Sequence, residues 1–185
     1  MRDVATIDAE AASFGWTRAA GAGCSFRRIT DSDLPFLARV YASTRTDELA
    51  AAPWTDEEKA AFLASQFDAQ HAHYQKCYPN ADWLVIARDG NDIGRLYIER
   101  WSAQHRIIDI ALLPEHRGKG FGGALLADLL DEATAAGKDV SIHVEKFNPA
   151  MRLYRRLGFV TEEDKGVYDL MRWTATASGD HAKIA

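Results

Sequence analysis

The chain has 185 residues, of which 47% are hydrophobic and 26% are charged, a balance typical of globular proteins and far from that of disordered ones. This length predicts one domain with its own core. The 22 Lys and Arg residues against 27 Asp and Glu residues give a formal net charge of -5. No overall positive field therefore favours nucleic acid as a partner.

The cysteine content argues against both disulfides and a metal. Cys24 and Cys77 are too few for a disulfide framework, and His71 and His73 lack the i,i+4 spacing of a helical zinc site. We expect no metal, with both cysteines filling the core in a reducing compartment. The N-terminal stretch lacks the pattern of a signal peptide, and no window reaches the roughly 18 apolar residues that span a bilayer. A cytoplasmic protein without a membrane partner is expected.

The first third of the chain predicts an extension, a strand and two helices. Residues 1–22 are Ala-rich and end next to Gly-Ala-Gly, which indicates an extension that can include a short helix. Residues 24–30 alternate as a strand does, and polar helix-start residues then precede apolar residues at helical spacing. Thr55 and Glu58 have the spacing of a capping box, which predicts a second helix over about 55–76.

The remainder is rich in strands. Three apolar, β-branched runs at 82–90, 91–101 and 105–114 are separated by short polar turns, which predicts three antiparallel strands. A glycine-rich loop then opens a helix that ends near Gly137. A strand over 139–145, a helix over 148–157 and a closing hairpin follow. We therefore predict one mixed α/β domain over 23–173 and a polar tail over 174–185.

The glycine-rich loop carries the strongest chemical signal. Four glycines, at 118, 120, 122 and 123, lie between a strand and a helix start, where free N-H groups and the helix dipole favour an anionic phosphate. Chain reversal alone is the competing reading. A Walker loop is excluded because Lys119 is followed by Gly120. A dinucleotide fingerprint is disfavoured because Asp139 begins the next strand rather than ending it.

Two motifs together resemble the GNAT N-acetyltransferase superfamily. Residues Arg117 to Gly122 fit Q/R-x-x-G-x-G/A, the acyl-CoA loop of that family. A second family element, N...LY...GF, is matched in order by Asn148, Leu153, Tyr154, Gly158 and Phe159. The resemblance implies a GNAT-like fold, with a mixed, mostly antiparallel sheet of about six to seven strands flanked by about four helices.

The resemblance also implies a reaction and a cofactor site. The chain would transfer the acetyl group of acetyl-CoA directly to a primary amine, without a covalent enzyme intermediate. Tyr154 matches the family tyrosine that protonates or hydrogen-bonds the CoA sulfur. The cofactor-binding positions that the resemblance assigns are Ile110, Ala111 and Leu112 along the strand, Arg117, Gly118, Lys119, Gly120, Phe121, Gly122 and Gly123 in the loop, and Asn148 with Tyr154.

The general base is harder to place. Family members often carry it on the strand before the loop, but the matching positions here are Arg106 and Ile108. Other members carry it five residues before the Asn, which is His143, and strand alternation puts Glu145 on the same face, where it could orient His143 or attract a cationic amine. Glu99 is the reserve candidate. Asp109 has the opposite parity and is expected to face away.

The acceptor is not identified by the sequence. The resemblance places the acceptor wall in the first two helices and their connection, where Trp54, Gln70 and Tyr74 are candidate substrate contacts and residues 46–53 a candidate lid. Small-molecule amines and protein or peptide amines both stay open, as does a homodimer. One rival is a non-catalytic acyl-CoA-binding sensor or scaffold, which Arg106 and Ile108 motivate. The other is a dinucleotide-dependent enzyme.

Overall fold

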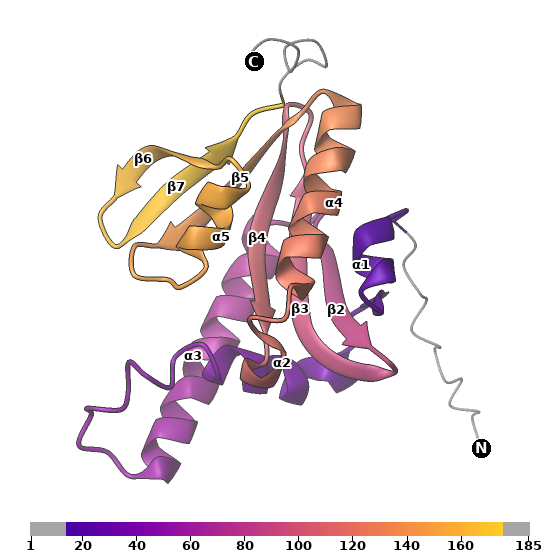
Figure 1. The fold of residues 1–185 in the computed structure, drawn as a ribbon. Coiled ribbons are helices and arrows are strands. Elements are labelled where there is room, and N and C mark those ends of the chain that lie inside the picture. Colours follow the sequence, from indigo (N-terminus) through magenta and orange to yellow (C-terminus); the bar gives the residue numbers. More distant parts are fainter. Residues whose placement is uncertain (1–13, 176–185) are drawn as a thin grey trace.

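The computed structural model describes residues 14–175, and these contain one sheet of seven strands (Figure 1). The strand order is β1-β2-β3-β4-β5-β7-β6, and all neighbours are antiparallel except β4 and β5, which run parallel. This confirms the predicted mixed, mostly antiparallel sheet. The strands are β1 (Cys24–Arg28), β2 (Asp82–Arg88), β3 (Asn91–Arg100), β4 (Gln104–Leu112), β5 (Asp139–Glu145), β6 (Val160–Lys165) and β7 (Tyr168–Trp173).

Within the described part of the chain, five α-helices cover the two faces of this sheet, one more than expected. Figure 1 shows α4 and α5 in front of the sheet with α1 beside α4, and α3 behind it. Single-turn 3-10 helices precede α2 and the glycine-rich loop, over Asp31–Asp33 and Pro114–His116. The α-helices are α1 (Thr17–Gly21), α2 (Leu34–Ala42), α3 (Asp56–Cys77), α4 (Phe121–Ala136) and α5 (Met151–Arg156).

Local sequence signals set the limits of the helices. The Thr55 hydroxyl accepts the Glu58 N-H at 3.2 Å and the Glu58 carboxylate accepts the Thr55 N-H at 2.8 Å, so the predicted capping box begins α3. Helix α4 ends at Gly137, whose φ of 64° is the left-handed conformation that glycine adopts without strain. Helix and strand bounds therefore agree closely with the sequence prediction.

Apolar side chains divide between the two faces of the sheet. On the α4 face the main core includes Leu96 and Ile98 of β3 with Leu126 and Leu129 of α4. A smaller cluster on the other face joins α2 to α3 through Leu37, Tyr41 and Phe67. Phe67 is the one buried residue among the 22 of α3, so the first half of this helix extends away from the sheet (Figure 1).

Residues 14–22 pack against the same core, although this segment was expected to belong to an extension. Trp16 is 5% exposed and meets the ring of Phe26 edge to face at 4.9 Å. Asp128 of α4 accepts the backbone N-H groups of Arg18 at 3.1 Å and of Ala19 at 2.7 Å, so it caps the first turn of α1. The remaining residues of the predicted extension and most of the predicted tail, 1–13 and 176–185, lie outside the described range.

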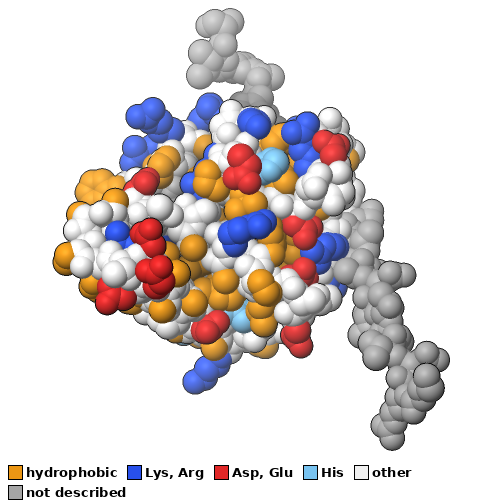
Figure 2. All heavy atoms as spheres, turned by 90° about the horizontal axis from the view of Figure 1, so that it is seen from below, with side chains coloured by type: hydrophobic (Ala, Val, Ile, Leu, Met, Phe, Trp, Pro, Cys, Tyr) orange, Lys and Arg blue, Asp and Glu red, His pale blue; other side chains and the backbone are white. Residues whose placement is uncertain are grey.

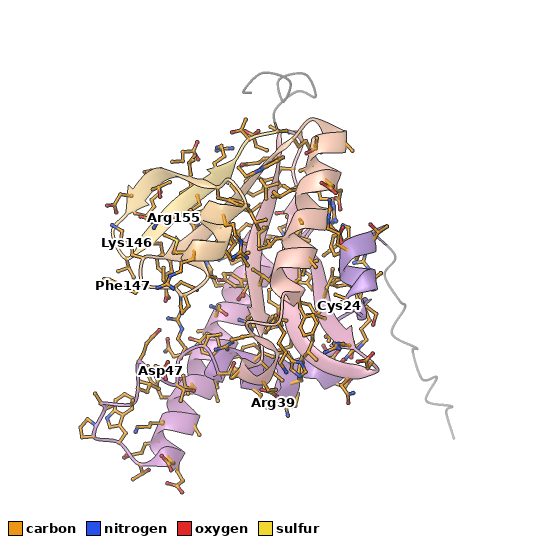
Figure 3. All side chains as sticks on the ribbon, viewed as in Figure 1. Cys24, Arg39, Asp47, Lys146, Phe147 and Arg155 are labelled. Carbon is orange, nitrogen blue, oxygen red and sulfur yellow. The ribbon has the colours of Figure 1, made fainter. Side chains whose placement is uncertain are left out.

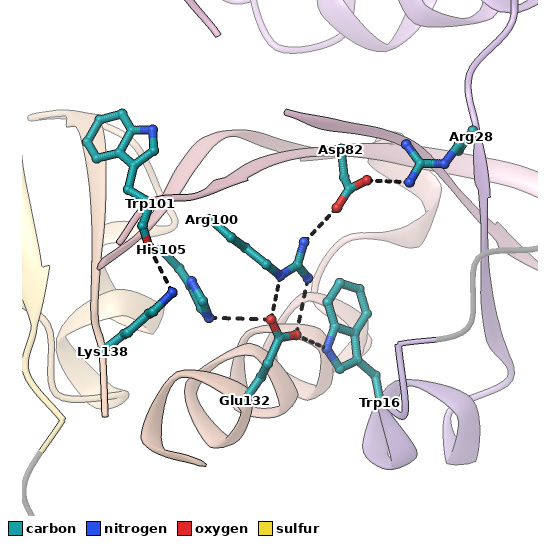
Figure 4. A network of polar contacts seen from close by, with 8 residues as sticks. All are labelled: Trp16, Arg28, Asp82, Arg100, Trp101, His105, Glu132 and Lys138. Atoms are coloured by element: carbon teal, nitrogen blue, oxygen red, sulfur yellow. Dashed lines mark hydrogen bonds and ion pairs between the residues drawn. The ribbon is translucent and has the colours of Figure 1, made fainter. Parts of the chain in front are cut away.

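A polar network ties α1, α4, β3 and β4 together (Figure 4). At its centre, Glu132 accepts hydrogen bonds from the Trp16 indole at 2.9 Å and from Arg100 Nε at 2.5 Å, and His105 Nε2 lies 3.3 Å from the same carboxylate. Burial opposes the ionisation of Glu132, but hydrogen bonds from His105 and Arg100 outweigh it and lower its pKa to about 2. Arg100 also pairs with Asp82 at 2.7 Å.

The two cysteines differ in environment. Cys24 is buried, as expected, whereas Cys77 is exposed at the end of α3 with its sulfur 3.7 Å from His73 Nε2, which corrects the expectation that both fill the core. Across residues 14–175 no group of three or more His, Cys, Asp and Glu side chains is arranged to hold a metal ion. Among the described helices, none combines the length and apolarity needed to cross a bilayer.

Candidate active site

The site begins where the two parallel strands separate. β4 and β5 pair only over Gln104–Ile107 and Asp139–Ile142, and beyond these residues each strand pairs only with its outer neighbour. The facing edges of 108–112 and 143–145 therefore carry backbone groups that do not pair with each other. Ile110, Ala111 and Leu112, the residues assigned to the pantetheine arm by resemblance, lie along this open edge.

A β-bulge at Ile108 changes which side chains face the site. Ile98 of β3 pairs with Ile107, but the preceding residue Tyr97 pairs with Asp109, so Ile108 is an extra residue. Paired residues share a face, and Asp109 consequently lies with Tyr97 on the α2/α3 face. The expectation that Asp109 faces away was wrong, because strict alternation does not hold across a bulge.

Asp109 lies in a polar cluster beneath α3. Arg95 is 2% exposed, and its Nη2 donates to Asp109 Oδ2 at 2.6 Å and to Gln70 Oε1 at 3.2 Å. Gln70 thus reaches the cluster, with its amide oxygen already held by Arg95. Burial, followed by the negative charge of Asp109, raises the pKa of the Tyr74 phenol. The structure therefore brings two predicted acceptor contacts, Gln70 and Tyr74, together around Asp109.

Tyr154 lies on the other face of the sheet, in the main core. It lies on α5, is 4% exposed and packs edge to face against Phe159 at 5.6 Å. Burial and then the charge of Asp109 raise the pKa of its phenol, so the hydroxyl keeps its proton well above neutral pH. Tyr154 is therefore a buried, protonated phenol, and the charge of Asp109 is the second cause of its raised pKa.

The glycine-rich loop leads directly into α4. Gly118 and Gly120 have φ values of 70° and 89°, and a Cβ added at either would meet no atom within 4 Å. Glycine is thus required here by the backbone conformation rather than by crowding. The first N-H groups of the 16-residue α4 have no partner within the helix. An open loop that presents N-H groups beside a free strand edge fits a pyrophosphate with an extended arm.

The side chain of Arg117 braces this loop. Its Nε donates to the Leu112 carbonyl at 2.7 Å, and its Nη2 donates to the Ser43 hydroxyl at 2.9 Å. The end of β4, the loop and the end of α2 are thereby joined. Of the remaining cofactor positions, Lys119 is exposed, Phe121 is buried, and Gly122 and Gly123 lie close to Leu153 of α5.

Asn148 has a local partner. Its Oδ1 accepts the Ala150 N-H at 2.8 Å, which forms the turn that begins α5. The side chain therefore positions the helix that carries Tyr154.

The predicted base candidates are engaged elsewhere. Arg106 Nη2 contacts His143 Nδ1, and since a guanidinium only donates, Nδ1 accepts and the proton of neutral His143 is on Nε2. Burial, and next the charge of Arg106, lowers the pKa of His143. Glu99 accepts the Asn80 N-H at 3.3 Å and the Trp101 indole N-H at 2.8 Å. No free basic atom remains on His143, and Glu99 holds the residues just before β2 and just after β3.

Glu145 joins the loop between α2 and α3 to the end of β5. Its carboxylate pairs with Arg45 Nη1 at 2.6 Å, and Arg45 also pairs with Glu48 at 2.8 Å. Figure 3 shows Asp47 of this loop below Lys146 and Phe147, which follow β5. The loop that includes the predicted lid therefore lies at the open end of the gap, and Glu145 contacts Arg45 rather than His143.

Trp54 lies apart from the other acceptor candidates. It packs against Phe62 at 5.2 Å, and Phe62 precedes Tyr74 by twelve residues of α3, about 18 Å along a helix. A groove of about 410 Å³ lies nearby between α2, the loop and α3, where Figure 2 shows exposed hydrophobic side chains among charged ones. Its α2 lining includes Ala38 and Ala42, which are not among the buried residues of that helix.

Comparisons with known proteins agree with this geometry. The profile of the Acetyltransferase (GNAT) family matches residues 40–159. A putative ribosomal protein bS18-alanine N-acetyltransferase of Bacillus subtilis is 28% identical over 135 residues, which cover 71% of this chain and 78% of that one. The human cysteine-rich protein 2-binding protein is 46% identical over 50 residues. These residues make up 27% of this chain but only 6% of that much longer protein.

Solved structures share the fold. The PaiA N-acetyltransferase of Thermoplasma acidophilum, solved in complex with coenzyme A, has a TM-score of 0.61 at 18% identity and matches 82% of this chain and 98% of its own. At this identity the likeness concerns the fold alone.

Proposed function

The chain belongs to the GNAT family of acetyltransferases, and from this membership we propose that it transfers the acetyl group of acetyl-CoA to a primary amine. The observation that carries the proposal is the divergence of β4 and β5 beside a glycine loop that opens α4. This arrangement pairs an anion-binding helix start with a free strand edge, the two features that a long phosphate-bearing thioester requires.

The loop and the strand edge are the proposed cofactor site. Backbone N-H groups from Arg117 to Gly123 would hold the pyrophosphate, and the open edge of Ile110 to Leu112 would hold the pantetheine arm. Arg117 supports this role through its side chain, because its bonds to Leu112 and Ser43 fix the loop against the strand.

Acetyl-CoA supplies an activated acetyl carbon and a thiolate leaving group. Tyr154 is the proposed acid, since its raised pKa keeps the hydroxyl protonated and able to donate to the departing sulfur. Asp109 is the proposed group that holds the acceptor ammonium and takes its proton. Arg95 fixes the orientation of that carboxylate with a 2.6 Å contact. Asp109 replaces His143 in this role because Nδ1 of His143 is bonded to Arg106.

The first test is calorimetric titration with acetyl-CoA, with NADH and ATP as controls. Binding of acetyl-CoA alone at about micromolar concentration is expected, followed by thiol release with an amine panel. The panel includes free amino acids, simple amines and a peptide with N-terminal alanine, because the Bacillus relative is named for alanine N-acetylation. Binding without turnover would favour the non-catalytic sensor. NADH binding would favour the dinucleotide enzyme, and absence of acetyl-CoA binding to folded protein would overturn the proposal.

A further inference from the structure

Two arginines in the described range are at least nine-tenths buried, and only one of them has a counterion. Arg95 is 2% exposed and pairs with Asp109 at 2.6 Å. Arg106 is 5% exposed, and within residues 14–175 no carboxylate oxygen lies within 4.0 Å of its guanidinium nitrogens. Burying a cation without a counterion is costly. The Arg106 guanidinium therefore has no carboxylate in direct contact with it.

The groups around Arg106 do not supply a counterion. Nη1 donates to the Ser141 hydroxyl at 3.3 Å, Nη2 donates to His143, and Nε is buried without a partner. Both partners are neutral, because His143 can accept from a guanidinium only when Nδ1 carries no proton. Glu99, the buried register partner of Arg106, is the nearest carboxylate in strand register, but its oxygens accept from the neutral N-H groups of Asn80 and Trp101 and lie more than 4.0 Å from the guanidinium nitrogens.

The cofactor phosphates do not fill this site either. Arg106 lies near the start of β4, whereas the glycine loop follows the end of the strand at Leu112. Six residues separate Arg106 from Leu112, about 20 Å along a strand. An anion bound at Arg106 would therefore come from a molecule other than the phosphate end of the cofactor.

The acceptor is in the right place to supply it. The register partners of Arg106 and Asp109 on β3 are Glu99 and Tyr97, which are two residues apart and about 7 Å along the strand. Because of the bulge, the side chains of Arg106 and Asp109 lie on the same face of the sheet, the one that α2 and α3 cover. His143, across the strand pair on β5, is exposed, so this side of the cluster opens to solvent. An amine held at Asp109 would place a neighbouring group within reach of Arg106.

We propose that Arg106 binds a carboxylate of the acceptor, with the Nε2-H of His143 as a second donor, so the acceptor is an amino acid or a similar amine that carries a carboxylate. This inference rests on the proposed acetyl transfer. A planar guanidinium donates two parallel hydrogen bonds to a carboxylate and at the same time gains a counterion in direct contact. Arg106 would then select the acceptor, and Asp109 would act on its amine.

The test compares acceptors of the same size with and without the carboxylate, glycine with glycinamide and L-alanine with L-alaninamide, and Arg106→Gln with the wild type on each, so that the different basicity of the two amines cancels. The wild-type protein is expected to have a KM for each acid about 10- to 100-fold below that for its amide. Arg106→Gln should raise the KM for the acids by a similar factor and so remove the preference. The control is Arg28→Gln, which removes an arginine of β1 that pairs with Asp82 of β2. This variant should keep the preference for acids. Equal use of acids and amides by the wild type, or equal loss of both in Arg106→Gln, would overturn the inference.

A second measurement does not depend on turnover. N-acetylglycine carries the carboxylate without a reactive amine, and its binding at Arg106 should raise the pKa of His143, measured by NMR of the imidazole. N-acetylglycinamide should leave that pKa unchanged, and so should N-acetylglycine added to Arg106→Gln. No shift in the wild type would contradict the site. Failure of the acetyl transfer itself would instead appear as absence of acetyl-CoA binding and of thiol release with acids and amides alike.

Discussion

Tyr97 of β3 pairs with Asp109 of β4, although the next residue, Ile98, pairs with Ile107. This one-residue bulge turns the Asp109 carboxylate to the face that α2 and α3 cover. It also starts the stretch of β4 that no longer pairs with β5. The same irregularity therefore opens the gap between the strands and supplies it with a carboxylate.

Asp109→Asn should lower kcat by about 100- to 10,000-fold, the usual range for loss of a general base. Steady-state thiol release with the best acceptor measures this effect. A thermal unfolding scan shows whether the loss of the counterion of Arg95 lowers the unfolding temperature. His143→Asn is the comparison. A larger loss of kcat in His143→Asn than in Asp109→Asn would return the role of base to His143.

Tyr154→Phe should lower kcat far more than it changes the KM for acetyl-CoA, because the phenol acts only as the thiolate departs. The raised pKa of Tyr154 also predicts that the wild-type enzyme shows no loss of activity from phenol ionisation up to its ordinary pKa of 10. The kcat-pH profile checks this. An alkaline decline below pH 10 that disappears in Tyr154→Phe would contradict a buried, protonated donor.

Gly120→Ala should weaken acetyl-CoA binding by about 5- to 30-fold, because a left-handed residue other than glycine costs roughly 1–2 kcal/mol and the loop would relax away from its N-H geometry. Gly137→Ala is a matched control at the other end of α4. Both glycines have positive φ and no atom within 4 Å of an added Cβ. Calorimetry should show normal affinity for Gly137→Ala, and equal losses in the two variants would mean that the loop does not bind the cofactor.

Gly94→Ala should disturb the strand edge that faces the gap. A Cβ at this position would overlap the Ala111 carbonyl oxygen and lie 2.7 Å from Leu112 Cδ2, so β4 must shift. Such overpacking is expected to destabilise the protein by about 1–3 kcal/mol and to weaken acetyl-CoA binding. Urea unfolding and calorimetry measure the two effects. Gly21→Ala, where an added Cβ meets no atom within 4 Å, should change neither.

Glu132 makes the fold sensitive to acid. Its pKa is lowered from 4.5 to about 2 in the folded protein, so its contribution to stability is complete above pH 4.5 and is lost as the pH falls towards 2. Glu132→Gln should reduce the free energy of unfolding at pH 7 by about 2–3 kcal/mol and by much less near pH 3. Glu162→Gln, on the exposed hairpin, should have no measurable effect at either pH. A pH-independent loss in Glu132→Gln would indicate packing rather than charge.

Strand and helix positions followed from local patterns. The capping box at Thr55, the turn at Asp89-Gly90 and the left-handed Gly137 each depend on a few adjacent residues, and the corresponding elements begin or end within one or two residues of prediction. The face of Asp109 could not be predicted this way. A bulge depends on how β4 fits against β3, and residues 105–112 contain no glycine to mark Ile108 as the extra one.

The ion-pair partners of the charged side chains could not be predicted from the sequence either. Arg45 and Glu145 are 100 positions apart, and their contact requires the loop after α2 to meet the end of β5. Arg106 was read as a departure from the family base position, and its burial without a carboxylate became visible only with the packed strands around it. Similarly, Trp16 gave no periodic signal, because a five-residue helix is too short to show one.

The contact between Arg117 and Ser43 joins the proposed cofactor loop to the helix that leads towards the proposed acceptor side. One guanidinium touches the end of α2, which leads into the acceptor wall, and also the last residue of β4 beside the cofactor loop. If acceptor binding shifts Ser43, the affinity for acetyl-CoA changes by some factor, and linkage requires acetyl-CoA to change the acceptor affinity by that same factor. Substrate affinities measured one at a time would then differ from those of the ternary complex, and Arg117→Ala, which removes the bonds to both the carbonyl and the hydroxyl of Ser43, should bring the two closer together.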